Sequence, residues 1–180
     1  MKKRSQTIKN LCLSAMFLAL CLLLPFLTAN ARELGNILCL MHIPVLLCGI
    51  VCSPIHGAVV GIMAPLLRSF LIGMPPFPAV AVPMAAELMV YGVSLGLLYR
   101  LFAKKTVYLY PSLILSMLLG RTVSVVAKYF LFALGRTEFS LKMVLQLNFI
   151  TTLPGAALQL LLIPAVLFLL KKRGVIFSEH

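Results

Sequence analysis

The stretch Leu40–Gly49 reads LMHIPVLLCG, and apolar sequence continues on both sides of it. Hydrophobic residues make up 62% of the 180-residue chain, whose mean hydropathy is +1.08. A helix needs about 20 apolar residues to cross a bilayer, so most of the chain is required for membrane spans. The apolar runs lack the alternation of transmembrane barrel strands. The sequence therefore predicts an all-α integral membrane protein with one domain over residues 1–180.

Prolines, glycines and polar residues divide the apolar sequence into six expected transmembrane helices. The last of these should be interrupted at Pro154-Gly155 and at Pro164, because proline has no N–H to donate within a helix. A tight turn over residues 53–57 should join the second expected helix to the third. The six helices are expected over residues 9–27, 37–52, 58–72, 79–102, 107–134 and 141–170.

Basic residues gather at the two ends of the chain and at one connection. The positive-inside rule places such clusters in the cytoplasm, so both termini are expected there, in agreement with an even number of spans. The connections 28–36, 73–78 and 135–140 then lie outside. Topology thus explains the net charge of +12 without a nucleic-acid partner. The clusters are Lys2, Lys3, Arg4 and Lys9; Arg100, Lys104 and Lys105; and Lys171, Lys172 and Arg173.

Four ionisable side chains lie within the expected helices: Arg68, Glu87, Arg121 and Lys128. Each such group costs about 2.5–3.5 kcal/mol to insert, and for this reason it usually faces the interior of the helix bundle. One interpretation is structural: Glu87 and Arg121 form an ion pair, while Lys128 reaches toward the outer interface. The other is an outward-facing pocket with excess positive charge, suited to a ligand that carries a carboxylate or phosphate.

Polar residues in the last expected helix allow two similar interpretations. Asn148, Thr151, Thr152 and Gln159 lie within one broad face near Pro154. They either form hydrogen bonds between helices or line a ligand site of the kind that transporters build at broken helices, with Asn148 as the candidate contact. His42, at the outer end of the second helix, is likewise either a structural residue or a ligand contact.

The sequence offers little for metal binding or catalysis. A Met-His pair binds metal when a free terminal amine completes the site, but Met41-His42 is internal. The five cysteines form no CxxC pair, which favours helix packing. There is no Asp, and no GxSxG, HExxH or Walker motif is present. We therefore expect no enzyme activity, no metal and no cofactor, and an ATP-using step would need another chain.

Ala15 and Ala19 form a pair of small residues one helical turn apart on the first expected helix. Such pairs let two helix backbones approach closely. The sequence alone leaves open whether this face packs internally or is offered to a partner subunit.

Motifs along nearly the whole chain resemble those of a known family. They are the Ala15-x-x-x-Ala19 pair, the polar loop 28–36, Met41–Gly49, Pro65–Ser69 with Gly73–Pro76, and Met84–Leu88 with Tyr91-Gly92. Together with six helices in about 180 residues, they resemble the substrate-binding S components of energy-coupling factor (ECF) transporters. These proteins import vitamins and related micronutrients in bacteria.

The resemblance implies a division of labour between subunits in the cell (cytoplasmic) membrane. An S component captures its substrate from outside, with loops 28–36 and 73–78 helping to close the pocket. It then docks on a transmembrane T subunit through the Ala15 and Ala19 face and topples in the membrane to release the substrate inward. Two ATPase subunits supply the energy.

The candidate substrate-binding residues are Arg121, Asn148, Arg68, Glu87, Lys128 and His42. Their excess of positive charge suggests an anionic or strongly hydrogen-bonding vitamin, with pantothenate or cobalamin as the leads from the resemblance. The alternative is a self-sufficient proton-coupled carrier that uses Glu87 as its proton site.

Overall fold

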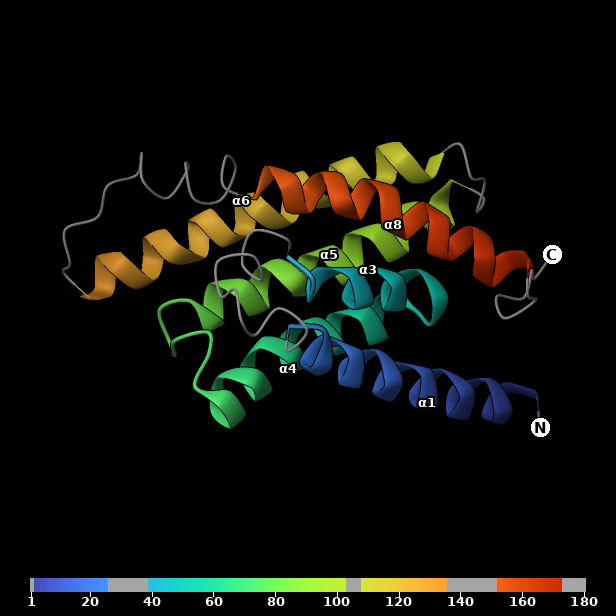
Figure 1. The fold of residues 1–180 in the computed structure, drawn as a ribbon, viewed down its shortest axis with the longest axis horizontal. Coiled ribbons are helices and arrows are strands. Elements are labelled where there is room, and N and C mark those ends of the chain that lie inside the picture. The colour runs from blue at the N-terminus through green and yellow to red at the C-terminus, as the bar shows by residue number, and fades with distance from the viewer. Residues whose placement is uncertain (1, 26–38, 103–107, 136–151, 173–180) are drawn as a thin grey trace.

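The computed structural model describes residues 2–25, 39–102, 108–135 and 152–172. Within these ranges the chain forms six helices and no strand. The all-helical prediction is thus confirmed for the described residues, whereas the number of spans and the side on which the termini lie stay predictions. The helices are α1 (Lys2–Leu23), α3 (His42–Val51), α4 (Pro54–Ile72), α5 (Ala81–Leu101), α6 (Leu109–Gly135) and α8 (Leu153–Lys172) (Figure 1).

Five of the six helices are long and apolar enough to cross a membrane, and α3 is the exception. Its 10 residues cover about 15 Å, half the thickness of the hydrocarbon core. Nine of them are buried, because the other helices surround α3. A short helix therefore occupies the middle of the bundle.

The helices run along a common long axis, and most neighbours in sequence point in opposite directions (Figure 1). Helix α5 is central and packs against α3, α4 and α6. Helix α1 covers α3 and α4, while α8 contacts α3 and α6. The start of α1 and the end of α8 lie at the same end of the bundle (Figure 1).

Glycines bring the backbones of α3, α4 and α5 into direct contact. A Cβ atom at Gly57 of α4 would lie 2.8 Å from the Cα of Gly49 in α3 and 3.0 Å from the Cα of Gly92 in α5. A Cβ at Gly92 would lie 2.9 Å from the Cα of Gly57. Real Cβ atoms almost never come this close, so only glycine allows this approach. Small residues serve the same purpose in other membrane helix interfaces.

The turn expected over residues 53–57 is shorter in the structure, because α4 already begins at Pro54. The Ser53 side chain accepts a hydrogen bond from the backbone N–H of His56 at 3.2 Å, which makes Ser53 the N-cap. Serine is a preferred N-cap residue, and proline fits the first helical position because its missing N–H is not needed there. The same residues that indicated a turn therefore start the helix.

The interruption expected at Pro164 in the last helix is not seen in α8. Pro154 lies in the first turn, where a proline is tolerated, and the helix continues through Pro164 to Lys172. Neighbouring helices often compensate for a proline within a membrane helix. The earlier part of this expected segment, residues 141–151, lies outside the described residues.

The end of α3 is tied to two neighbouring helices through one carbonyl group. The Cys52 carbonyl oxygen accepts a hydrogen bond from Arg100 Nη2 of α5 at 3.1 Å and from Asn10 Nδ2 of α1 at 3.5 Å. The last carbonyls of a helix have no partner within it, and these side chains supply one. The three helices are thus joined at the end of the bundle where α1 begins.

We predict that Gly92→Ala lowers the stability of the protein by about 1–3 kcal/mol, the usual range for overpacking. The added methyl group would press against the backbone of Gly57, so α4 and α5 would have to separate. Thermal unfolding of the purified protein in detergent measures the effect. Leu97→Ala is the matched control, because Leu97 lies on the same helix but is 47% exposed. Equal melting temperatures for Gly92→Ala and the wild type would show that the glycine contact is not required.

Candidate functional site

A cavity of about 190 Å³ lies beside the first turn of α3, among α4, α5, α6 and α8. Polar side chains from all five helices line it, although the helices themselves are apolar. Among the described residues, no group of three His, Cys, Asp or Glu side chains is placed to hold a metal ion. The principal polar lining residues are His42, Arg68, Glu87, Arg121, Lys128 and Gln159.

The Glu87 carboxylate is held by side chains from two helices. The Tyr91 hydroxyl, one turn further along α5, donates a hydrogen bond to Glu87 Oε1 at 2.9 Å. His42 Nε2, at the start of α3, lies 3.8 Å from the same oxygen, and the rings of His42 and Tyr91 are 5.4 Å apart. This group therefore fixes the position of the only carboxylate among the described residues.

Tyr91 is itself positioned by α6. Its side chain is 1% exposed, and its ring lies against the Cα of Gly120, where any added Cβ would collide with it. A Cβ at Gly120 would also come within 3.0 Å of the Glu87 carbonyl oxygen. The close contact between α5 and α6 thus orients the Tyr91 hydroxyl toward Glu87.

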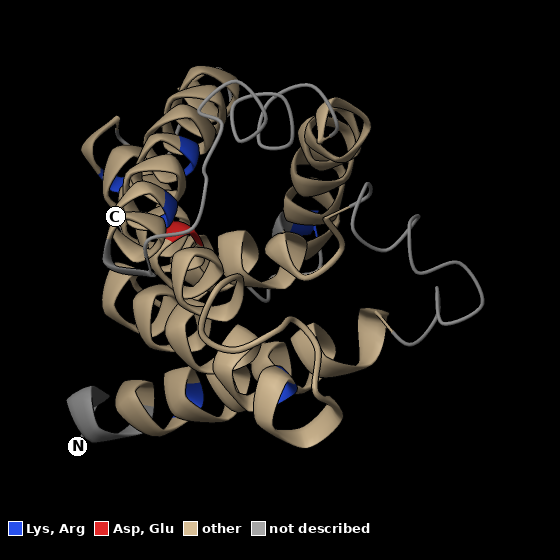
Figure 2. Ribbon diagram, turned by 90° about the vertical axis from the view of Figure 1, so that its left-hand side faces the viewer, with Lys and Arg blue, Asp and Glu red and all other residues tan. Residues whose placement is uncertain are grey.

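The three basic residues of the cavity come from α4 and α6. Arg121 and Lys128 lie on the same face of α6, with Ser124 between them, because three or four residues make one helical turn. Arg121 is 7% exposed, and its Nη2 donates to the Thr152 carbonyl at 3.3 Å, just before α8 begins. Arg68 reaches the cavity from the last part of α4. In Figure 2 the one acidic segment lies beside basic segments where the helices meet.

Four buried polar atoms of the cavity have no hydrogen-bond partner within the described part of the chain. They are His42 Nδ1, Arg68 Nε, Ser124 Oγ and Gln159 Oε1. Burying a polar atom without a partner costs about 1–3 kcal/mol. The cavity thus presents both donors and acceptors that a polar molecule could satisfy.

The structure brings together five of the six residues proposed as substrate contacts. His42, Arg68, Glu87, Arg121 and Lys128 all line the cavity, while Asn148 lies outside the described residues.

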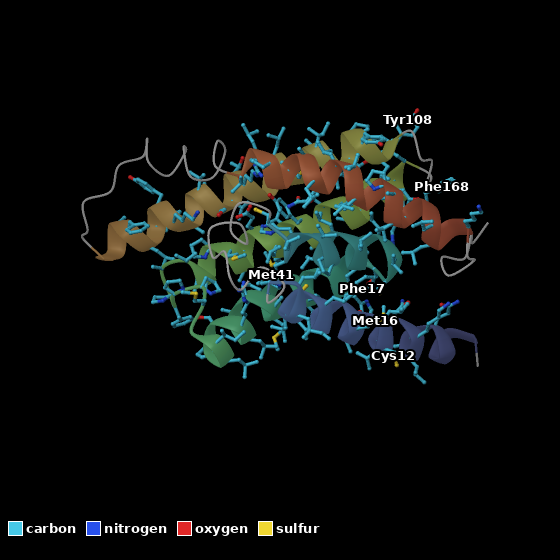
Figure 3. All side chains as sticks on the ribbon, in the orientation of Figure 1. Cys12, Met16, Phe17, Met41, Tyr108 and Phe168 are labelled. Atoms are coloured by element: carbon cyan, nitrogen blue, oxygen red, sulfur yellow. The ribbon has the colours of Figure 1, made fainter. Side chains whose placement is uncertain are left out.

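Ala15 and Ala19, in contrast, are exposed on α1, on the side away from α3 and α4. Cys12 is exposed and Met16 is 51% exposed on the same side of this helix (Figure 3). Among the described helices, therefore, none covers the face that carries the two alanines.

Two polar residues of this site, Tyr91 and Ser124, were not among the predicted substrate contacts. Helical spacing could have indicated both, since Tyr91 lies four positions after Glu87 and Ser124 lies three positions after Arg121. Their hydroxyl groups carry no charge, so the search for ionisable residues in apolar segments passed over them, although Tyr91 belongs to one of the family motifs.

A family model described as "ECF transporter, substrate-specific component" matches residues 9–177. The chain belongs to this family. The resemblance predicted from the sequence motifs is thereby confirmed. A search of the curated proteins found no match to the chain, and a search of the solved structures found none either.

Membership in the family makes the chain a membrane protein of the transport class rather than an enzyme. It also implies a substrate and an interaction with the T subunit and ATPase modules of an ECF transporter.

We predict that Tyr91→Phe destabilises this S component by about 1.5–3 kcal/mol, the usual contribution of a hydrogen bond to a charged group. The substitution removes only the hydroxyl that donates to Glu87 Oε1 and keeps the ring against Gly120. Thermal unfolding in detergent measures the loss. Tyr129→Phe is the matched control, because Tyr129 lies on α6 and is 53% exposed. An unchanged melting temperature for Tyr91→Phe would mean that the hydroxyl does not hold Glu87.

Proposed function

We propose that this S component captures a small vitamin from outside the cell in the cavity beside α3. The observation that carries the proposal is the cavity itself, which gathers buried polar side chains inside an otherwise apolar bundle. Ionisable side chains are costly at this depth. A role in binding a polar substrate would explain why these side chains are present despite this cost. Such a role is expected in a family of substrate-binding subunits.

The proposed roles of the side chains follow from their charge and contacts. Arg68, Arg121 and Lys128 would attract an anionic group of the vitamin. Glu87, held by Tyr91 and His42, would receive hydrogen bonds from another part of the ligand. Asn148 stays a proposed contact from the segment before α8. Pantothenate and cobalamin are the leads for the substrate.

The proposed location is the cell membrane, with both termini in the cytoplasm. The start of α1 and the end of α8 lie at one end of the bundle (Figure 1), and both carry basic residues. Under the positive-inside rule this end would face the cytoplasm. Pro78 and the other residues of the connection between α4 and α5 would then lie outside, where the substrate arrives.

Delivery of the substrate inward would require a T subunit and two ATPase subunits. The exposed Ala15 and Ala19 on α1 would form the docking face, since small side chains allow a partner helix to approach closely. A self-sufficient proton-coupled carrier would instead transport without partners and would lose uptake in Glu87→Gln. Reconstitution of the chain alone in lipid vesicles, followed by an uptake assay, separates these two modes.

We predict that Arg121→Ala weakens binding of the vitamin by about tenfold or more, because hydrogen bonds to charged groups are worth about 1.5–3 kcal/mol. Ligand-dependent thermal stabilisation of the purified chain measures the affinity, since a ligand at 100 times its Kd adds about 2.7 kcal/mol. Thr122→Ala is the control, because Thr122 is the exposed neighbour of Arg121 on α6. Unchanged affinity in Arg121→Ala would leave Arg121 with a structural role only.

We predict that Ala15→Phe and Ala19→Phe leave vitamin binding unchanged but abolish transport by the full complex. The bulky side chains would keep a partner helix at a distance, whereas the cavity lies on other helices. The two measurements are binding to the purified chain and uptake by cells that express all subunits. Leu118→Phe is the control, because Leu118 is a 50% exposed residue of α6. Loss of binding in the alanine variants would indicate internal packing instead.

A further inference from the structure

We infer that the ligand of this cavity is a small organic anion that also donates a hydrogen bond, and that Gln159 accepts this bond. The inference rests on the proposed function, because it names the class of ligand for the same cavity. It also assigns a binding role to a residue of α8.

The charge of the cavity selects an anion. Its described lining contains three basic side chains, Arg68, Arg121 and Lys128, and one carboxylate, Glu87, so positive charge is in excess there. Arg68 Nε is buried and has no hydrogen-bond partner among the described residues. A guanidinium N–H can only donate, and a planar anionic group is its best acceptor. A cationic vitamin would add to the positive charge and lose this contact.

The side chain of Gln159 indicates that the same ligand also carries a hydrogen-bond donor. Its side chain is 1% exposed, it lines the cavity from α8, and its Oε1 has no partner within the described part of the chain. An amide oxygen only accepts hydrogen bonds, so a hydroxyl or an amide N–H of the ligand is the group that fits. The charge of the cavity does not require the ligand to carry a hydrogen-bond donor. The contact with Gln159 therefore narrows the class of ligand independently of charge.

The volume of the cavity limits the size of the ligand. At about 190 Å³ it is below the range of about 300–1,000 Å³ that is typical of sites for drug-sized ligands. This volume favours a compact acid such as pantothenate, which carries one carboxylate together with hydroxyl and amide donors, over a larger vitamin such as the corrinoid cobalamin.

Discrimination against neutral analogues follows from the same contacts. A site built around buried hydrogen-bonding groups rejects an analogue that leaves those groups unpartnered. Panthenol has an alcohol in place of the carboxylate of pantothenate and keeps the other donors. It should therefore lose the contact with Arg68 while keeping the contact with Gln159.

The test measures the Kd of pantothenate and of panthenol by titration calorimetry on the purified full chain in detergent. Wild type should bind pantothenate at least about 100-fold more tightly, since a buried charged contact is lost with panthenol. Arg68→Met should reduce this ratio to about tenfold or less. Gln159→Leu should weaken both ligands about tenfold and leave the ratio unchanged. Leu161→Ala, at a 71% exposed position of α8, should change neither.

A second readout separates a ligand contact at Gln159 from a structural role. Without ligand, Gln159→Leu should melt at the same temperature as wild type or higher, because it removes a buried polar atom that has no partner. A lower melting temperature together with an unchanged Kd would overturn the assignment of Gln159. If biotin proves to be the ligand, its neutral amide derivative takes the place of panthenol in the same comparison.

The remaining outcomes distinguish failure of this inference from failure of the proposed function. Tightest binding of thiamine, riboflavin, folate, cobalamin or panthenol would overturn the inference and leave the proposed function standing. Binding of none of these compounds, nor of pantothenate or biotin, would overturn the proposed function and the inference with it.

Discussion

The contact between the backbones of α3, α4 and α5 is the constraint on which the rest of the structure depends. Gly49, Gly57 and Gly92 place these three helices closer together than any residue with a side chain would allow. Lipid tails are as apolar as leucine, so the hydrophobic effect does little to hold membrane helices to one another, and close packing has to do so. The glycine contact therefore sets both the separation of the helices and their rotation about their axes.

The cavity follows from this rotation. With Gly92 turned toward α4, Glu87 and Tyr91 face α3 and α6, so that the carboxylate meets His42. The contact of Tyr91 with Gly120 then fixes α6. The side of α6 that carries Arg121 is thereby directed at the same space. A few residues without side chains thus determine where the charged residues converge.

Sequence reasoning predicted much of the fold and most of the candidate cavity residues, because ionisable residues in apolar segments are rare and costly. It did not predict which residues would be partners. The contact of Glu87 with His42 joins residues 45 positions apart, and it depends on helix rotation that no local pattern encodes. The continuity of α8 through Pro164 was also missed, since a proline in a membrane helix is compensated by neighbouring helices that the local sequence does not show.

The position of the first turn of α3 explains how so many polar groups are accommodated inside an apolar bundle. This turn faces the cavity, and nine of the ten residues of α3 are buried. The polar side chains of α4, α5, α6 and α8 therefore converge on the end of a helix that is itself enclosed. They can face one another there without meeting lipid. Burying one helix end in the bundle is thus a way to build a polar interior in a protein whose outer surface stays apolar.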